Sequence, residues 1–460
     1  MRDVTAFCSI AFAFATLLEG CLDNEGRPPP AREIYFPTAL AASTDLSGNL
    51  EYLFVVNSDF DLRYNAGTLH SYDLSVVESL VDSCTEPQQP CEFPVDAEGQ
   101  GEAYFIDSVR IGAHGNDIAI SPDQERLYLV SRSDEELTYV DLGADGSLNC
   151  SEADRCTALD RAGSNEDVSL PNQPLGLVVR RRSELNDSLS GDFVLMAHRG
   201  RQASLFEILD GQAPVLVDTI DELPSDLVAA TWNPQTRRAW MPSISERRIA
   251  NVGIAVDALT MEDDEVELFD AGSILLEDLD FITGGSGDTR AVAFDPRGLD
   301  THPFVYIVAR EPRSLLIADL REREPNVLNI VDIVELGDGA SRMALAQVQA
   351  EGTDASFNLA FVSCFDSRDL YIIDIDRRRL VAVTRNLSGP FDLIVDPQRR
   401  LVYLGDFNNS VIRIVDLTPL LSCLVDNYVG DNTSTKFEER ECAPTTRALL
   451  GTPQPIQELR

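Results

Sequence analysis

Charged side chains recur at one position in a series of apolar segments of this chain. When the first segments of successive repeats are aligned by their apolar residues, five charged residues fall near the segment starts: Asp117, Asp226, Arg290, Arg342 and Asp392. Three more polar residues stand at or just after the ends of the segments that follow: Arg132, His198 and Arg310. Guanidinium groups hold carboxylates or phosphates by paired hydrogen bonds. The set predicts a binding site for a polar or zwitterionic ligand, with no catalytic residue assigned.

The same charges allow a second interpretation, in which the acids and arginines only pair with one another across a solvated opening. The segment at 59–65, DFDLRYN, places several oxygen ligands in one loop but lacks the full spacing of a calcium loop. The chain has no glycine-rich phosphate loop, HExxH or Gly-x-Ser-x-Gly motif. We therefore predict neither a metal site nor a cofactor.

The elements that must position these charges are best seen at residues 390–417, PFDLIVDPQRRLVYLGDFNNSVIRIVDL. Three apolar runs alternate here with two turns, one of which contains Asp396 and Pro397. The proline suits a type I turn, and the aspartate can accept hydrogen bonds from the backbone. The runs are rich in β-branched and aromatic residues and nearly continuous, which is typical of strands packed on both faces. Such a unit needs copies of itself on either side.

Six further copies precede this one. Each contains three apolar runs, and a fourth run separates most neighbours; the copies span residues 38–74, 116–142, 175–209, 226–257, 290–320 and 342–375. Four strands per unit and seven units predict an all-β fold, a seven-bladed β-propeller of four-stranded antiparallel blades. A pair of β-sandwiches is the alternative, and it explains the recurring Asp-Pro and Ser-Pro-Asp turns less well.

Two stretches carry a family resemblance: AISPDQERLYLVSRSDEELTYVDL and LIVDPQRRLVYLGDFNNSVIRIVDL. Both resemble the YVTN-type propeller repeat of secreted bacterial surface proteins, and the resemblance covers nearly all of residues 35–420. It implies that the first strand of each blade lines the axis, which would place the aligned charges at the mouth of the axial channel. For the fourth strand of the last blade we predict residues 447–450, with Ile34-Tyr35-Phe36 as the competitor.

The N-terminal residues predict export. Val4 to Leu18 is an apolar run too short to span a bilayer comfortably, and Leu18-Glu19-Gly20-Cys21 resembles a bacterial lipobox, although Glu19 departs from the pattern. We predict a lipoprotein signal peptide at 1–20, lipidation of Cys21, a proline-rich tether at 21–33 and a single propeller with disulfide-bearing loop insertions at 34–460. An ordinary signal peptide is the alternative. The predicted location is the outer membrane, facing the periplasm or the surface.

The remaining cysteines fit an oxidising compartment. Six of them lie in polar insertions and form near-neighbour pairs: Cys84 with Cys91, Cys150 with Cys156, and Cys423 with Cys442. Cys364 lies inside an apolar run and is predicted to be a buried free thiol.

The charge of the chain narrows the class of partner. The formal net charge is −40, and of 37 Lys and Arg residues only Lys436 is lysine. Nucleic acids and anionic membrane surfaces repel such a chain, so contact with a membrane is expected only through the lipid anchor. We predict a monomer that acts as a lipid-anchored binding scaffold for an envelope protein or glycan, with the ligand at the channel mouth. The alternatives are a lactonase-like propeller hydrolase and a structural envelope protein without a ligand.

Overall fold

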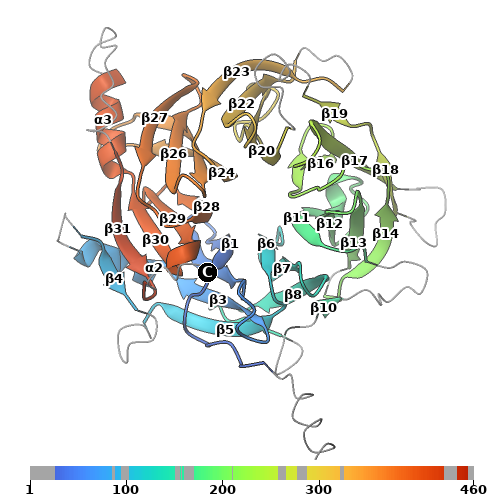
Figure 1. Cartoon of the computed structure of the whole chain (residues 1–460), viewed down its shortest axis with the longest axis horizontal. Coiled ribbons are helices and arrows are strands. Elements are labelled where there is room, and N and C mark those ends of the chain that lie inside the picture. Colours follow the sequence, from blue (N-terminus) through green and yellow to red (C-terminus); the bar gives the residue numbers. More distant parts are fainter. Residues whose placement is uncertain are drawn as a thin grey trace, which may run out of the picture.

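Seven antiparallel sheets form a ring around a central axis in the computed structural model, with blade one (blue) beside blade seven (orange to red) in Figure 1. The predicted seven-bladed propeller is therefore confirmed. The structure describes residues 26–84, 89–94, 103–150, 156, 158–159, 170–209, 211–256, 266–276, 287–321, 326–428 and 443–453. No helix within these ranges is long and apolar enough to cross a membrane.

Within each blade the strands are ordered from the axis outward. Blade one contains β1 (Pro37–Thr44), β2 (Leu50–Asn57), β3 (Gly67–Asp73) and β5 (Phe105–Ile111). Blade two contains β6 (Gly115–Ile120), β7 (Arg126–Ser131), β8 (Glu136–Leu142) and β10 (Ala158–Leu159), and β9 (Leu148–Asn149) also pairs with β8; blade three contains β11 (Pro174–Arg181), β12 (Asp192–His198), β13 (Ala203–Ile208) and β14 (Val215–Ile220). Blade four contains β15 (Thr231–Asn233), β16 (Arg238–Pro242), β17 (Arg248–Val256) and β18 (Val266–Asp270), and β19 (Ile274–Leu275) also pairs with β17.

Blade five contains β20 (Thr289–Phe294), β21 (Phe304–Ala309), β22 (Ser314–Asp319) and β23 (Asn329–Glu335). Blade six contains β24 (Ala340–Gln349), β25 (Ser356–Cys364), β26 (Asp369–Asp374) and β27 (Arg379–Thr384). Blade seven contains β28 (Pro390–Asp396), β29 (Leu401–Asp406), β30 (Val411–Asp416) and β31 (Thr445–Leu450).

The nearly continuous apolar strands are explained by packing between blades. All six residues of β29 are buried, and its Val402 and Leu404 share one apolar cluster with Phe361 and Ile372 of blade six. Because neighbouring blades cover both faces of a strand, its side chains are apolar at successive positions. Truncating a buried ring such as Phe361 to alanine would cost ~3–5 kcal/mol.

The ring is closed by the C-terminal segment. β31 pairs antiparallel with β30, which confirms the predicted fourth strand of blade seven. The competing N-terminal residue Ile34 is buried in the apolar cluster shared by blades one and seven, and it adds no strand. A short strand from the blade-one insertion, β4 (Cys91–Phe93), then pairs in parallel with the outer side of β31. β4 and β31 lie together at the rim of the ring in Figure 1.

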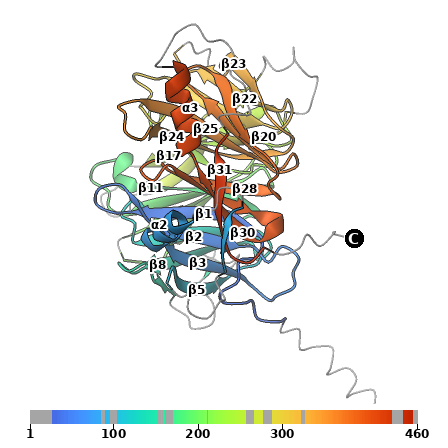
Figure 2. The same cartoon turned by 90° about the vertical axis from the view of Figure 1, so that its left-hand side faces the viewer.

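Helix α2 (Leu74–Ser83) and the disulfide Cys84–Cys91 connect blade one to β4. The carboxylate of Asp73 caps the helix by accepting hydrogen bonds from the N–H groups of Ser75 and Val76. The second helix, α3 (Thr418–Tyr428), leads from β30 toward the closing strand. Figure 2 shows both helices on the outside of the ring. Two one-turn 3-10 helices, η1 (Arg182–Glu184) and η3 (Phe407–Asn409), complete the described elements.

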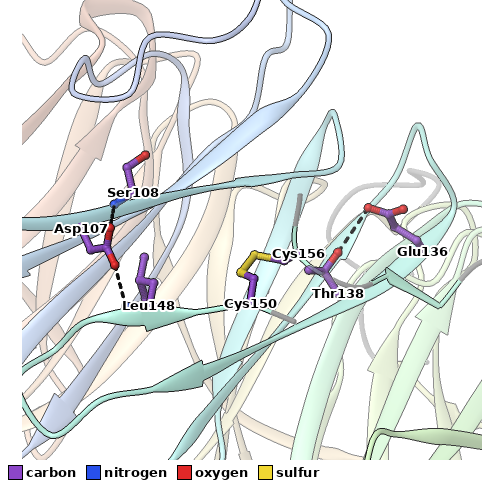
Figure 3. Close-up of a disulfide and its surroundings, with 7 residues drawn as sticks. All are labelled: Asp107, Ser108, Glu136, Thr138, Leu148, Cys150 and Cys156. Carbon is purple, nitrogen blue, oxygen red and sulfur yellow. Dashed lines mark hydrogen bonds between the residues drawn. A yellow bond between two sulfur atoms is a disulfide. The ribbon is translucent and has the colours of Figure 1, made fainter. Parts of the chain in front are cut away.

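The disulfide predictions are confirmed where both cysteines are described. Figure 3 shows Cys150 bonded to Cys156 beside β9, where Leu148 donates its backbone N–H to Asp107 of blade one at 3.0 Å. The bond therefore holds an insertion of blade two against its neighbour. Cys364 is free and fully buried, as predicted, and burial raises its thiol pKa to about 12. Cys423 lies on α3, and Cys442 lies outside the described residues.

The predicted signal peptide and Cys21 also lie outside the described residues. Of the predicted tether, residues 26–33 are described, and they lie against blade one rather than free of it. Arg27 forms a β-bridge with Tyr64, and Pro29 is buried. The reason is that this segment finds backbone partners in the loop after β2: the carbonyl of Arg27 accepts a hydrogen bond from the N–H of Asn65 at 3.1 Å.

Candidate binding site at the channel mouth

Five arginines face one pocket at the end of the ring where the inner strands begin. The pocket has a volume of about 220 Å³ and is lined from six of the seven blades by Asn116, Arg132, Leu175, Arg199, Val228, Ile244, Arg290, Arg310, Ser341, Arg342 and Phe391. Four of these arginines were predicted from the sequence at the channel mouth: Arg132, Arg290, Arg310 and Arg342. The structure brings these four together.

A β-bulge at the start of the inner strand aims many of these side chains. In blade five, Thr289 pairs with Ala309 and Ala291 with Val308, so Arg290 between them has no partner in the ladder. The same shift skips Asn116, Leu175 and Ser341 in their blades. A bulged residue is turned out of the regular alternation, and bulges often re-aim a side chain at a functional site.

The bulge corrects the sequence alignment of the ring. By pairing register, Arg290 is equivalent to Asn116 and Ser341, whereas Asp117 and Arg342 stand one residue further along their strands. The sequence alignment had placed Arg290 level with Asp117 and Arg342, because a bulge of one residue leaves no mark in an apolar pattern. Arg290 and Arg342 therefore occupy different layers of the channel.

Arg342 lies between two aspartates in the deeper layer. Its Nη2 atom is 3.5 Å from the Oδ1 atom of Asp117, and the two side chains are only 16% and 15% exposed. Burial raises the pKa of Asp117, and it raises the pKa of Asp392 to about 6, although the Arg342 charge opposes both shifts. Burial also disfavours the guanidinium charge, but Asp117 and Asp392 outweigh it and raise the pKa of Arg342. Asp117 and Arg342 thus form a largely buried ion pair, and Asp392 lies close enough for its charge to act on Arg342.

Two arginines of the outer layer also have carboxylate partners. Arg290 donates from Nη2 to Asp288 at 2.7 Å, and Arg199 donates from Nε to Asp226 at 2.8 Å. Asp226 lies in the turn before β15, with φ of 54°, and it is not among the lining residues of the pocket. The predicted carboxylates Asp117, Asp226 and Asp392 are thus engaged with arginines or backbone N–H groups, and they leave part of the arginine charge unmatched.

Arg310 and Arg132 supply that unmatched charge. Arg310 donates to the carbonyl oxygen of Ala340 at 2.9 Å and to the hydroxyl of Ser341 at 2.8 Å. Burial, reinforced by the nearby charge of Arg290, lowers the pKa of Arg310. Arg132 is exposed at the pocket edge. Within the described part of the chain, neither guanidinium has a carboxylate at ion-pair distance.

His198 does not reach the mouth, and its predicted place there is wrong. It is the last residue of β12, is 0% exposed, and shares a hydrogen bond of 2.8 Å between Nε2 and the Ser204 hydroxyl. Burial lowers its pKa to about 4, so the ring is neutral at pH 7. Because β12 is the second strand of its blade, its side chains face the neighbouring blades rather than the axis. The next residue, Arg199, takes the position predicted for His198.

In the loop after β2, whose sequence partly resembles a calcium loop, the buried carboxylate of Asp59 is bound by the backbone. Asp59 is buried, and its Oδ1 atom accepts a hydrogen bond from the N–H of Tyr64 at 3.1 Å. Burial raises the pKa of Asp59 to about 6. Among the described residues there is no group of three or more His, Cys, Asp or Glu side chains arranged to hold a metal ion.

Comparisons with known proteins place the fold and little more. No protein-family model matches the chain, and no curated protein matches it in sequence. Among solved structures, it is similar to a candidate 6-phosphogluconolactonase from Bacteroides fragilis, with 12% identity and a TM-score of 0.53, over 88% of this chain and 98% of the other. Two WD40 propellers are also similar: the C-terminal domain of Sif2 (10% identity, TM-score 0.48, 94% of this chain and 91% of the other) and the domain of Doa1 (11%, 0.48, 84% and 96%). Identities this low support the β-propeller fold alone.

Proposed function

We propose that this protein is a binding scaffold of the cell envelope that holds an anionic ligand group at its channel mouth. The observation that carries the proposal is the convergence of five arginines on one pocket of about 220 Å³ in a chain of net charge −40. Fixed positive charge gathered in a concave site on an acidic molecule favours a local anion over any extended polyanion.

Arg310 and Arg132 are the groups that would receive the anion. The other three arginines of the pocket have acidic partners within the protein, whereas these two do not among the described residues. A guanidinium held by a carbonyl and a hydroxyl, as Arg310 is, keeps a full positive charge and further N–H groups for a carboxylate or phosphate.

The proposal also includes the cellular location of the protein. The lipobox-like run ending at Cys21 supports export and lipid anchoring, and the two described disulfides suit an oxidising compartment. An outer-membrane lipoprotein would present the mouth to envelope proteins or glycans. The lactonase-like alternative rests on a likeness in fold, and no contact at the mouth favours it.

The test is capture of envelope components on immobilised protein. The wild type is compared with Arg132→Ala and Arg310→Ala, and with Arg321→Ala as a matched control. Arg321 follows the third strand of its blade at the opposite end of the ring and is 65% exposed. We expect the two mouth variants to weaken retention by ~1.5–3 kcal/mol, the usual worth of a hydrogen bond to a charged group. Equal retention by all four proteins would rule out the mouth as the site.

A further inference from the structure

An aromatic patch continues the arginine pocket across blades six, seven, one and two. Its members are the six rings of Phe36, Phe60, His114, Phe365, Phe391 and Phe407. Phe391 also lines the arginine pocket, and its ring centroid is 5.9 Å from that of Phe407. Phe407 in turn lies 5.2 Å from Phe60, which is 51% exposed. Phe407 is itself only 6% exposed, so it is a buried base on which the more exposed rings of Phe391 and Phe60 pack beside the arginine pocket.

Local structure fixes the exposed ring of Phe60. The turn that carries it is closed by a hydrogen bond of 3.0 Å from the N–H of Leu62 to the carbonyl of Asp59. The imidazole of His114 is 3.0 Å from the carbonyl oxygen of Phe60, and its other nitrogen contacts the hydroxyl of Ser133. Leu62, on the same turn, is 61% exposed. An apolar tip held in this way at the rim of a charged pocket fits a partner's apolar group.

The chemistry of the patch selects among anionic ligands. Five of its six rings are phenylalanines, and both nitrogens of the sixth, His114, already have contacts. Sugar hydroxyl groups lose hydrogen bonds when they are placed against such a surface, whereas aliphatic and aromatic side chains gain from it. A pocket of about 220 Å³ is also below the usual size of a small-molecule site. The surface thus fits one side chain of a larger partner in the pocket and another on the patch.

We propose, on the basis of the proposed function above, that the mouth binds an acidic peptide segment of a partner protein, in which a carboxylate stands close to apolar side chains. The carboxylate is held by Arg310 and Arg132, and the apolar side chains rest on Phe391 and Phe60. Because both rings pack on Phe407, at 5.9 and 5.2 Å, their centroids are at most about 11 Å apart, a distance that about three residues of extended chain can span at roughly 3.3 Å each.

Net charge refines the expected segment. Because the whole molecule carries a formal charge of −40, it repels a partner segment with a long acidic run. A segment with one or two carboxylates beside leucine, isoleucine or an aromatic residue keeps the local attraction of the arginines and the burial of apolar surface. It meets less of the long-range repulsion.

A phage-displayed library of random dodecapeptides tests this inference. The purified full-length protein is panned in parallel with Phe60→Ala, Arg310→Ala and the control Arg321→Ala, after thermal melting has shown that all are folded. We expect enriched peptides to carry Asp or Glu within three residues of a large apolar side chain. A synthetic copy of one should bind wild type and the control equally and lose at least tenfold in affinity with either mouth variant.

Three other outcomes would overturn the inference, and they separate it from the proposed function. Enriched peptides that are acidic without apolar residues, and insensitive to Phe60→Ala, would leave an anion site with no role for the patch. No enriched peptide, together with Arg310-dependent binding of an oligogalacturonate probe, would assign the site to an acidic glycan. No binding of either probe, with no envelope component retained, would overturn both proposals.

Discussion

Two aspartates of the channel each accept a backbone hydrogen bond from the neighbouring blade, at two different blade-to-blade contacts of the ring. Asp392 of blade seven accepts a hydrogen bond from the N–H of Leu40 in blade one at 2.8 Å. Asp117 of blade two accepts one from the N–H of Leu177 in blade three at 3.1 Å. The inner strand of a blade is a sheet edge whose N–H groups need partners. At the residue scale, therefore, these acids join blades, and the neighbouring arginine makes their burial tolerable.

This role predicts a pH dependence of stability for Asp392. Its folded pKa of about 6 lies above the ~3.9 of an unfolded aspartate, so the folded state takes up the proton first. Its contribution to stability is therefore greatest at low pH and is lost as pH rises through 6. The difference in unfolding free energy between Asp392→Asn and wild type should shift by ~1–3 kcal/mol in favour of the variant from pH 4 to pH 7, at 1.36 kcal/mol per pKa unit.

Urea unfolding of both proteins at several pH values measures this difference. A constant offset is expected as well, because an asparagine has one acceptor oxygen for the two N–H groups, of Leu40 and Leu393, that the carboxylate serves. The comparison removes the pH dependence that the other carboxylates contribute. A difference that stays flat from pH 4 to pH 7 would show that Asp392 is not buried as a charged group.

At the scale of elements, the sequence predicts the blades well and the mouth in part. Arg132, Arg199 and Arg310 all directly follow the second strand of their blades, and Phe365 and Phe407 take the same place in two others. This pattern is present in the sequence, but a shift of one residue selected His198 instead of Arg199. The bulges at the inner strands could not be predicted, because they arise from how one strand meets the next rather than from a composition signal.

The insertion that carries β4 gives a prediction at the same scale. The disulfide between Cys84 and Cys91 holds β4 next to β31, where Gly451 donates its N–H to the Phe93 carbonyl at 2.9 Å. Replacing both cysteines by alanine should cost about 2 kcal/mol, as expected for a short loop. It should also weaken the hydrogen-exchange protection of residues 448–451 in particular.

The pair Cys150 and Cys156 is the matched control for this variant. Its sequence separation of 6 is close to the 7 of the first pair, but it holds an insertion against blade one rather than the closing strand. Removing it should have a similar cost and leave β31 protected. If both variants expose β31 equally, the insertion does not secure the closure.

At the scale of the whole molecule, the chain combines an acidic surface with a positively charged mouth. The net charge can be read from the composition, whereas the convergence of five arginines on one pocket appears only when the blades are in register. Membrane attachment is also a property of the whole molecule, since a single lipid-bearing residue before the ring would decide where the mouth is displayed.

Cys21→Ala tests that attachment. The variant should lose partitioning into the detergent phase, because the proposed lipid is carried by this thiol. Cys8→Ala is the control, since Cys8 lies within the predicted signal peptide and its replacement should leave partitioning unchanged. Detergent phase separation followed by immunoblotting reads both, and a Cys21→Ala protein that still partitions with the detergent would contradict the assignment.

The pairing of β4 with β31 also determines which contacts can form only late in folding. Phe93 and Leu450 are neighbours in the ring, yet almost the whole chain must be made before they meet. A chain that emerges N-terminus first presents its early blades while the face of blade one that will meet blade seven is still bare. The hydrogen bond from Leu40 to Asp392 forms across that same late joint. A chain interrupted before blade seven therefore displays apolar surface for proteases to attack, and it lacks Phe391 of the mouth although all five arginines have been made.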